Sequence, residues 1–339
     1  MTQPKILVTG GCGYIGSHTI VDLIQHGYEV VSIDNFSNST PSVLEGIQQI
    51  VGFPITNYAI DICDKAALEV VFKQHSDIQG IIHFAALKSV PESVSRPIDY
   101  YRNNMVSLYN LLDMVAIYNI PYFVFSSSCS VYGNVATLPV SEATPFGEAQ
   151  CPYARTKQHG EEVVKDFAPT ATTQSILLRY FNPVGAHPTA LIGELPNGVP
   201  NNLVPYITQT AIGKLPQLTV YGDDYNTRDG SCIRDYIHVM DIAHAHTLAV
   251  GHLIAKNQHS AIDIFNLGTG TGVTVFEVIE AFERVSGVQL NYKVGDRRPG
   301  DIEAVYANND KAKKILGWSL QYDLSDMMQS AWLWQKKLS

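Results

Sequence analysis

Short apolar runs alternate with longer amphipathic stretches through the first half of the chain. The expected strands are 5–9, 29–34, 57–61, 80–86 and 122–128, and the expected helices begin after Gly16 and cover 43–51, 65–75 and a stretch within 99–118. Nearly continuous apolar strands that alternate with helices are typical of a parallel sheet covered on both faces. The pattern therefore predicts a doubly wound α/β fold of the Rossmann type.

This rhythm loosens after a further strand at 175–182, where five prolines fall between positions 183 and 205. Helices are expected again at 237–254, 275–285 and 324–336, with short strands at 218–222 and 263–268 between them. We therefore predict a dinucleotide-binding domain over 1–182 and a smaller C-terminal α/β substrate lobe over 183–339. The interleaved strands indicate that the second part crosses back to the first domain.

Composition narrows the class of protein. The 339 residues are 45% hydrophobic, which provides ample material for a core, and 32 acids against 23 Lys and Arg give a net charge of −9. An acidic chain lacks the electrostatic footprint of a nucleic-acid binder. No apolar run has the length of a transmembrane helix, the N-terminus lacks a signal-peptide pattern, and the five cysteines are scattered. We expect a soluble cytoplasmic protein with no membrane or nucleic-acid partner.

A glycine motif, GGCGYIG at 10–16, follows the first expected strand directly. Glycines at this point let the backbone turn tightly against a pyrophosphate, which then rests on the N-terminal amides of the next helix. The second strand ends in Asp34, whose carboxylate can accept hydrogen bonds from the adenosine ribose hydroxyls and would repel a 2′-phosphate. This arrangement predicts binding of NAD rather than NADP.

Two further strand ends lie at the edge where open α/β sheets bind ligands. The third strand is expected to end at Asp61 and Ile62, and Asp61 either reaches the adenine amino group or serves as a plain loop carboxylate or cap. The fourth ends at Phe84, Ala85 and Ala86, whose small alanines allow close approach of a cofactor to the backbone.

The strongest catalytic signal is Tyr153 followed four residues later by Lys157, at the start of an expected helix. Residues four apart share one helical face. A tyrosine that acts as a base at neutral pH needs its pKa of about 10 lowered by about three units, and Lys157 together with an oxidised nicotinamide can supply the positive charge. Ser126, Ser127 and Ser128 end the fifth strand upstream and offer a hydroxyl for the same substrate oxygen.

Three histidines, His238, His244 and His246, are close enough in sequence to suggest a metal site. On a helix, however, positions 238 and 246 lie about two turns apart and 244 faces elsewhere. No acid completes a ligand set in this segment. We therefore expect no metal site.

At this level of detail the chain resembles the extended short-chain dehydrogenase/reductase family and, within it, the UDP-galactose 4-epimerases. The likeness runs from Lys5 to Trp334. Its motifs are GGCGYIGSH at 10, DNFSNS at 34, FAALKSV at 84, FSSSCSVYG at 125, YARTK at 153, LRYFNPVGAHP at 178, PNNLVPYI at 200, DGSCIRDYIHVMDIA at 229, FNLGTG at 265 and RRPGD at 297.

The resemblance implies a set of site residues. For NAD these are Gly10, Gly13, Tyr14, Ile15, Gly16, Asp34, Asn35, Asn38, Ser39, Asp61, Ile62, Phe84, Ala85, Ala86, Lys88, Asn103, Tyr153, Lys157 and Tyr180, to which we add Ser126. For the sugar nucleotide they are Ser128, Tyr153, Asn182, Asn202, Leu203, Tyr221, Arg234, Arg298, Asp301 and Val305. Arginines suit the two phosphates of a UDP-sugar, although Arg234 and Arg298 are equally placed to pair with Asp235 and Asp301.

The reaction that the resemblance implies is epimerisation of UDP-glucose and UDP-galactose at C4 through a transient 4-keto sugar. Tyr153 acts as base, Lys157 lowers its pKa and Ser128 steadies the oxygen. A homodimer formed through the long helix within 99–118 is also implied. The alternatives are a 4,6-dehydratase, a decarboxylase or a non-catalytic NAD-binding scaffold. Related dehydratases carry Asp-Glu directly after the hydroxyl residue, where this chain has Cys129 and Ser130.

Substrate breadth is expected to depend on the position four residues beyond the Asp of RRPGD, which is Val305. In the epimerases that the chain resembles, a tyrosine there restricts the enzyme to plain hexoses and a small residue admits N-acetylated ones. We therefore expect the chain to accept UDP-N-acetylglucosamine and UDP-N-acetylgalactosamine. Two other outcomes stay open: Val305 merely packs, or a shift of one residue places Tyr306 at this position.

Overall fold

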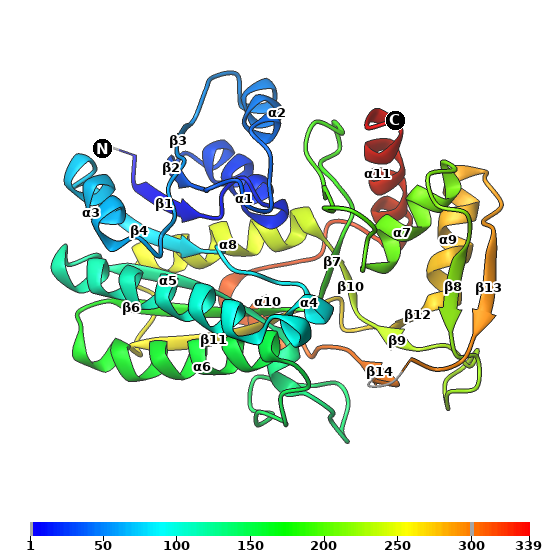
Figure 1. Ribbon diagram of the computed structural model, residues 1–339. Coiled ribbons are helices and arrows are strands. Elements are labelled where there is room, and N and C mark those ends of the chain that lie inside the picture. The colour runs from blue at the N-terminus through cyan, green and yellow to red at the C-terminus, as the bar shows by residue number, and fades with distance from the viewer. Residues whose placement is uncertain (1–2, 299–301) are drawn as a thin grey trace.

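A computed structural model describes residues 3–298 and 302–339 and places a seven-stranded parallel sheet at the centre of the molecule (Figure 1). The strand order is β11-β6-β5-β4-β1-β2-β3. The strands are β1 (Lys5–Thr9), β2 (Glu29–Ile33), β3 (Thr56–Tyr58), β4 (Ile78–His83), β5 (Tyr122–Ser128), β6 (Gln174–Tyr180) and β11 (Ile262–Leu267). The order reverses between β1 and β4, as in the Rossmann fold. The predicted doubly wound α/β class is confirmed.

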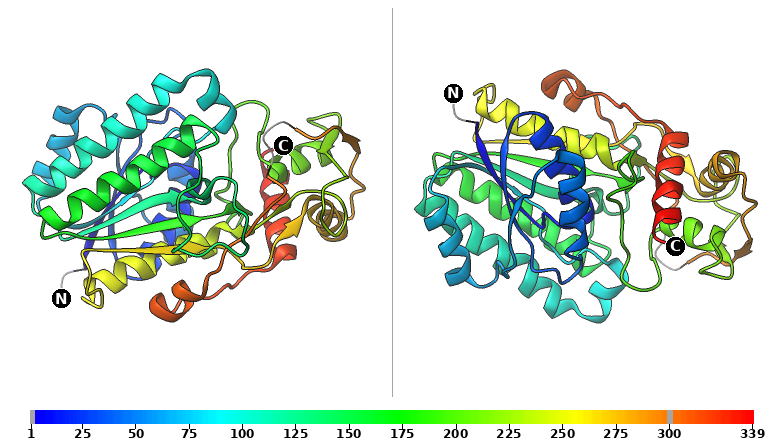
Figure 2. Two further views of the ribbon diagram at one scale, coloured as in Figure 1. Left: turned by 90° about the horizontal axis from the view of Figure 1, so that it is seen from below. Right: turned by 90° about the horizontal axis from the view of Figure 1, so that it is seen from above.

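Helices cover both faces of this sheet because its strands are apolar on both sides (Figures 1 and 2). On one face, α1 (Tyr14–Gln25), α2 (Ser42–Val51) and α8 (Val239–Ile254) pack on a cluster that includes Ile6 and Val8. On the other, α3 (Lys65–Gln74), α5 (Pro97–Ile117) and α6 (Pro152–Phe167) pack on a cluster that includes Leu7. Successive residues of β1 thus enter opposite cores, as the two-residue period of a strand requires.

The second half of the chain forms a smaller lobe from short strand pairs and helices. Its strands are β7 (Asn182–Val184), β8 (Leu218–Tyr221), β9 (Ile233–Arg234), β10 (Tyr236–His238), β12 (Val273–Thr274), β13 (Tyr292–Gly295) and β14 (Ala304–Val305). Its helices are α7 (Leu203–Ala211), α9 (Val275–Ser286) and α11 (Leu324–Lys337), which share one apolar core. The remaining helices are α4 (Val90–Ser95) and α10 (Asp310–Leu316). From this half, α8 and β11 return to the main sheet.

The predicted end of the third strand is wrong. Pairing of β3 with β2 stops at Tyr58, and the Ile60 N–H donates to the Tyr58 carbonyl, which turns the chain. The Asp61 carboxylate then accepts from the Cys63 N–H at 2.8 Å. Asp61 and Ile62 therefore lie in a loop, because a local side-chain bond to the backbone competes with the ladder.

Other boundaries also differ from the prediction: the predicted strand 175–182 is divided between β6 and β7, and the predicted helix 237–254 begins at Val239. Helix α1 begins at Tyr14, inside the glycine motif rather than after it. Strand β4 ends at His83, so Phe84, Ala85 and Ala86 follow it. The shift of α1 shortens the loop between β1 and α1 to residues 10–13, and the shift of β4 lengthens the segment that follows this strand.

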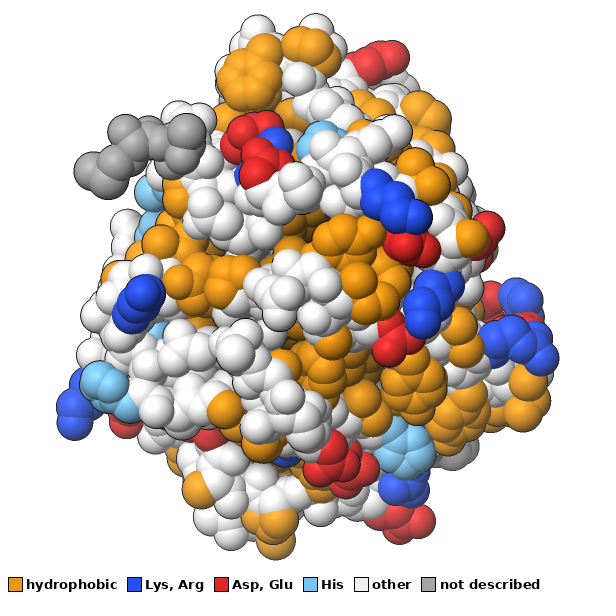
Figure 3. All heavy atoms as spheres, turned by 90° about the vertical axis from the view of Figure 1, so that its left-hand side faces the viewer, with side chains coloured by type: hydrophobic (Ala, Val, Ile, Leu, Met, Phe, Trp, Pro, Cys, Tyr) orange, Lys and Arg blue, Asp and Glu red, His pale blue; other side chains and the backbone are white. Residues whose placement is uncertain are grey.

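The surface is mixed in charge. In the view of Figure 3, lysine and arginine side chains lie beside acidic ones, with apolar side chains between them. Within residues 3–298 and 302–339, no helix combines the length and apolarity that are needed to cross a membrane.

A buried ion pair fixes α6 on the sheet. Glu161 of α6 is fully buried and binds Arg179 of β6 through two bonds, from Nε to Oε1 at 2.7 Å and from Nη2 to Oε2 at 2.6 Å. Ser127 of β5 donates to the same carboxylate at 2.5 Å. A two-pronged guanidinium bond of this kind is strong and directional. It sets the position of α6 along β5 and β6.

We predict that Glu161→Gln lowers the free energy of unfolding by about 3–5 kcal/mol, because it leaves the Arg179 charge buried without its partner. Urea denaturation of the ligand-free protein measures this loss. Glu69→Gln, which removes an exposed partner of Lys73, is the control and should change the midpoint little. Equal effects of the two substitutions would contradict the assignment.

Candidate active site

The glycine turn between β1 and α1 forms an open cradle. Gly10 has φ +69°, in the left-handed region that favours glycine. A Cβ atom at Gly16 would lie 2.2 Å from the Gly10 carbonyl oxygen, so a side chain there has no space. Gly13 is the N-cap of α1 and offers no side chain to the first helical amides. These N–H groups and the helix dipole are therefore available to an anion, and Tyr14 and Ile15 are among the residues that supply them.

Asp34 connects this cradle to the loop after β2. Its Oδ2 accepts from the Cys12 N–H at 2.9 Å, and its Oδ1 accepts from the Phe36 N–H at 2.9 Å and from Ser39 Oγ at 2.8 Å. Asn35 and Asn38 lie exposed on the same loop. Of the predicted cofactor residues of this loop, Ser39 thus binds the Asp34 carboxylate, and Asn35 and Asn38 lie near it in the sequence.

The cradle lies at the point where the strand order reverses. A Cβ atom at Gly10 would lie 2.8 Å from the Ala85 nitrogen, so the turn after β1 and the segment after β4 are in close contact. Phe84 and Ala86 flank this contact, and Lys88 follows with its Nζ 5.9 Å from the centre of the Tyr14 ring. Ligands of open α/β sheets bind at such a switch point.

Other predicted cofactor residues lie at the neighbouring edge. Asn103 of α5 donates from Nδ2 to Asn104 Oδ1 at 3.0 Å, and its carbonyl accepts from the Cys63 thiol. Asp61 forms its loop bond to Cys63 and stays exposed, whereas Ile62 is buried. Asp61 therefore acts as a loop carboxylate, which is one of the two expected roles. Because it is exposed, its carboxylate is also accessible to a ligand.

Tyr153, Lys157 and the serines of β5 are brought together where α6 starts beside the end of β5. Lys157 Nζ donates to the Ser126 carbonyl at 2.7 Å and lies 6.0 Å from the centre of the Tyr153 ring. The Tyr153 phenol is hydrogen-bonded to Ser128. The Ser126 hydroxyl is bonded to the Tyr180 hydroxyl. These residues, which are separated in the sequence, therefore form one cluster in the structure.

The electrostatics of this cluster depend on burial. Burial raises the pKa of Tyr153 above its usual value of 10, and the hydrogen bond with Ser128 opposes this rise. Burial lowers the pKa of Lys157 to about 8, and the charge of Glu161 opposes that fall. In the protein alone, the pKa of Tyr153 thus moves in the direction opposite to the one predicted, because desolvation of the phenolate outweighs nearby stabilising groups.

The predicted sugar-nucleotide residues other than Ser128, Tyr153 and Asp301 belong to the smaller lobe. Asn182 begins β7, Asn202 precedes α7 without a capping side-chain hydrogen bond, and Leu203 is the first residue of that helix. Tyr221 ends β8 with an exposed ring, and the Arg298 guanidinium lies 5.3 Å from its centre. Arg234 ends β9. Asp301 lies outside the described residues.

Val305 lies directly beside Arg234. The two residues are register partners in the parallel pair of β14 and β9. Val305 is buried with Phe181 and Val131 in a small cluster next to the end of β5. Tyr306 points the other way, against Gly272, as strand alternation requires. Val305 therefore faces the cluster that borders Ser128, and Tyr306 does not.

The three histidines from the sequence do not converge. His238 stacks on Tyr322, with ring centres 4.1 Å apart. His246 is buried against Phe84, with ring centres 4.6 Å apart. His244 instead faces Asp22 of α1, with Nδ1 3.3 Å from Oδ2.

Comparison with known proteins identifies the family. The UDP-glucose 4-epimerase of Bacillus subtilis is 47% identical over 331 residues, which cover 97% of this chain and 96% of the relative. This chain belongs to the UDP-glucose 4-epimerase family. The predicted resemblance is therefore confirmed, and it extends over nearly the full length of the chain.

Solved structures of epimerases agree with this family assignment. The UDP-glucose 4-epimerase of Stenotrophomonas maltophila, solved with NAD and formylated UDP-arabinopyranose, superposes with a TM-score of 0.96 at 44% identity and 99% coverage of both chains. The UDP-Glc/GlcNAc 4-epimerase of Campylobacter jejuni has a TM-score of 0.85 at 35% identity and covers 98% of this chain and 99% of its own.

A broader family model, described as GDP-mannose 4,6 dehydratase, matches residues 7–331. Dehydration would require an acid and a base that remove water across C5 and C6. Directly after Ser128 this chain has Cys129, whose thiol pKa is raised to about 12 by burial, and Ser130. Neither side chain exchanges protons readily at neutral pH. The epimerase family assignment therefore fits the site better than the dehydratase label.

One residue of this epimerase-family site has no signal in the sequence. Glu194, mostly buried in the loop before α7, accepts from Asn202 Nδ2 at 2.9 Å and pairs with Lys88 Nζ at 3.5 Å. The Trp334 indole of α11 donates to the Glu194 carbonyl at 2.8 Å. Glu194 thus joins a predicted cofactor residue to a predicted substrate residue. Lys88 is 106 positions away from it, so spacing along the chain does not reveal this pairing.

We predict that Lys157→Met flattens the pH dependence of stability between pH 8 and 10.5. The native pKa of about 8 lies below the unfolded value of 10.5. As the pH falls through this window, the unfolded chain gains a proton that the native state resists, so wild type loses stability. At pH 7 the variant should therefore be more stable by about 2–3 kcal/mol.

Urea denaturation of the ligand-free protein at several pH values measures this slope. Lys73→Met, which removes an exposed lysine of α3, is the control and should keep the slope of the wild type. A slope that survives in Lys157→Met would refute the assigned burial cost.

Proposed function

We propose that this protein is an NAD-dependent UDP-glucose 4-epimerase, which interconverts UDP-glucose and UDP-galactose through a transient 4-keto sugar. The observation that carries the proposal is the cluster of Tyr153, Lys157 and Ser128 beside the glycine cradle. The cluster offers a proton carrier for the sugar hydroxyl next to a site for a hydride carrier. Membership of the epimerase family supports the same reaction.

The cofactor residues fit NAD. The uncapped N-terminus of α1 suits a pyrophosphate, and Gly10, Gly13 and Gly16 leave the space that it needs. Asp34 already accepts two hydrogen bonds at Oδ1 and one at Oδ2 from its own loops. Since a carboxylate oxygen has two lone pairs, Oδ2 keeps one for a ribose hydroxyl. The negative charge of Asp34 disfavours a 2′-phosphate. NAD supplies the hydride chemistry at the sugar C4, and Lys157 holds the nicotinamide ribose.

Tyr153 is the group that moves the proton. As a phenolate it takes the proton of the 4′-hydroxyl while C4 gives up its hydride, and the carbon-oxygen bond becomes a carbonyl. Ser128 holds the oxygen. The keto sugar then rotates in the site and presents the opposite face of C4. Tyr153 returns the proton to O4 as hydride returns to that face. No proton or electron is gained overall.

The raised pKa of Tyr153 in the protein alone has a role in this mechanism. Burial keeps the phenol protonated until positive charge is brought next to it. Lys157 already lies beside the phenol, so the charge that we assign to this step is that of an oxidised nicotinamide, which adds to that of Lys157. The base thus forms only in the loaded enzyme.

The UDP moiety is held by the smaller lobe. Asn202, Leu203 and the α7 N-terminus are assigned to the phosphates together with Arg234 and Arg298, and Tyr221 to the nucleoside. Directed cations are needed because a protein with a net charge of −9 repels a diphosphate at long range. Asn182 and Ser128 are assigned to the sugar. Asp301 completes the set at a position that the structure does not describe.

We predict that Tyr153→Phe lowers kcat by at least 10²- to 10⁴-fold, the usual contribution of a general base. NAD and UDP should still bind, because the substitution removes one hydroxyl. A coupled assay of UDP-galactose conversion measures kcat, and UDP titration measures binding. A turnover within tenfold of wild type would exclude Tyr153 as the base. Retained NAD binding with no epimerisation in the wild type would instead favour a non-catalytic scaffold.

We also assign N-acetylated UDP-hexosamines as substrates. Val305 borders the site from β14 and lacks the ring that would occupy the space of an acetamido group. The structural neighbour from Campylobacter jejuni carries both substrate classes in its name, which supports the assignment.

We predict that Val305→Tyr lowers kcat/KM for UDP-N-acetylglucosamine at least tenfold more than kcat/KM for UDP-glucose, because the ring fills the acetamido space. Chromatography of the products with each substrate gives the two values. Tyr306→Phe is the matched control, since its ring packs on Gly272, and should leave the ratio unchanged. Rejection of N-acetylated substrates by the wild type would refute the assignment.

A cytoplasmic homodimer completes the proposal. The five free thiols are consistent with a reducing compartment. The dimer is assigned to α5, where Ile98 is 64% exposed and Tyr109 is 48% exposed. They lie three turns apart on one side of the helix, which suits a helix pair between two copies. Sedimentation velocity distinguishes this dimer from a monomer.

A further inference from the structure

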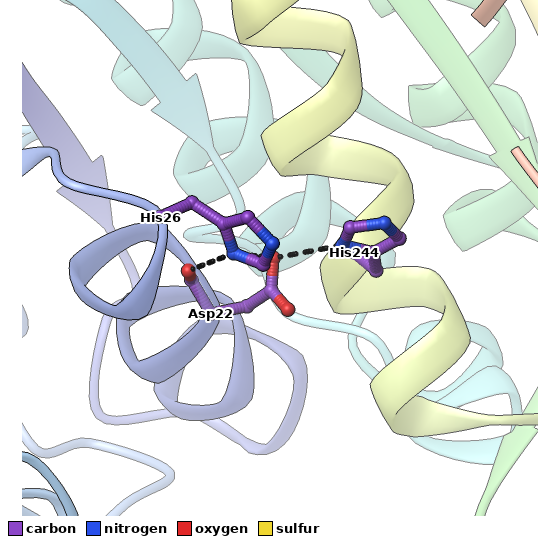
Figure 4. Close-up of side chains that lie close together, drawn as sticks. All are labelled: Asp22, His26 and His244. Atoms are coloured by element: carbon purple, nitrogen blue, oxygen red, sulfur yellow. Dashed lines mark hydrogen bonds and ion pairs between the residues drawn. The ribbon is translucent and has the colours of Figure 1, made fainter. Parts of the chain in front are cut away.

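Three donor side chains meet where α1 packs against α8, away from the active site. Asp22 and His26 lie one turn apart at the end of α1, and His244 faces them from α8 (Figure 4). The ligand atoms of the three side chains all lie within 4.8 Å of one another. The Asp22 side chain is 8% exposed, that of His244 30% and that of His26 46%. The carboxylate is thus buried, while the imidazoles leave a path to solvent.

Their spacing suits a tetrahedral metal ion. His244 Nδ1 lies 3.3 Å from Asp22 Oδ2. Zinc bonds of about 2.0–2.1 Å to nitrogen and oxygen place neighbouring tetrahedral ligands about 3.3–3.4 Å apart. Two imidazoles and one carboxylate are also a ligand set that zinc accepts in sites with a water at the fourth position.

His26 is already oriented for this role. Its Nδ1 lies 2.7 Å from the Asp22 carbonyl oxygen, so Nδ1–H donates to the backbone. The edge of the ring with the other nitrogen faces His244 (Figure 4). Histidines that bind metals commonly donate their second ring N–H to a carbonyl or carboxylate, which fixes the ring. The ring is about half exposed, and its Nδ1 also lies 3.3 Å from Asp22 Oδ2.

The negative charge of the buried Asp22 carboxylate also favours a cation at this position. Within the part of the chain that the structure describes, the basic partners of the Asp22 carboxylate are these two histidines. A buried carboxylate is costly without a positive partner.

We propose that Asp22, His26 and His244 form a binding site for a divalent transition-metal ion, with Zn²⁺ as the probe. Asp22 lies nine residues beyond Gly13, about 13 Å along the axis of α1. The ion therefore has no part in the chemistry at the glycine cradle. It joins α1 to α8, and its effect is on stability.

The test is Zn²⁺ binding to the NAD-loaded protein without a histidine tag, after treatment with a chelator. At pH 7.5, isothermal titration should give one Zn²⁺ per chain. His244→Gln should weaken this binding at least tenfold, and His26→Gln should do the same. His252→Gln, a substitution on the same helix α8, is the matched control and should bind as the wild type does.

Thermal unfolding gives a second readout that does not depend on activity. Zn²⁺ at about a hundred times the wild-type Kd should raise the melting temperature of the wild type by about 2–5 °C and that of His244→Gln by no more than about half as much. His26 caps the helix from an exposed position, so His26→Gln keeps the test available if His244→Gln fails to fold.

Two results would overturn the proposal. Absence of Zn²⁺ binding by the wild type would mean that the histidines only exchange protons with Asp22. Undiminished binding by the folded His244→Gln or His26→Gln variant would place the ion elsewhere, for example on a cysteine thiol.

Discussion

The buried pair of Glu161 and Arg179 is the interaction on which the geometry of the active site depends. Tyr153 and Lys157 lie in the first turns of α6, and the carboxylate two turns further along binds Arg179 of β6 and Ser127 of β5. Gly160 reinforces this position, because a Cβ atom there would lie 2.6 Å from the Phe125 ring. The helix can therefore neither slide nor lift, and Lys157 stays bonded to the Ser126 carbonyl.

The same arrangement explains the electrostatic character of the site. A helix held this closely to the sheet buries the functional groups of Lys157 and Tyr153, and burial moves both pKa values away from the charged forms. The burial of Lys157 thus lowers the stability of the native state, although with a pKa of about 8 the lysine is still mostly charged at pH 7. Such costs are typical of functional sites, where groups are held in environments that they would not adopt freely.

Local sequence signals predicted much of this structure. Lys5–Thr9 and Tyr122–Ser128 are strands over their full predicted lengths, because each is a compact run that a turn or loop bounds. The glycine motif could be predicted because the residues that form the turn are consecutive in the sequence. The predicted end of the third strand is wrong because the Asp61 carboxylate accepts a hydrogen bond from its own loop. The hydrophobic pattern does not show that this bond competes with strand pairing.

Features that need the folded chain were beyond prediction. The direction of the Tyr153 pKa shift depends on burial, which the Y-x-x-x-K spacing does not report. His244 meets Asp22 across 222 positions, so a search for nearby ligands in the sequence excluded it. Glu194 lies in a proline-rich loop like many other surface acids, and only the fold brings it to Lys88.

Glu194 has one more consequence. Its Oε1 accepts from both Lys88, which we assign to the cofactor, and Asn202, which we assign to the substrate, so in the proposed enzyme a ligand that moves one partner changes the bond to the other. Coupling of this kind is reciprocal: if a sugar nucleotide changes the affinity for the dinucleotide, the dinucleotide changes the affinity for the sugar nucleotide by the same factor. In the proposed enzyme, Glu194 thus links a residue assigned to the dinucleotide with one assigned to the sugar nucleotide.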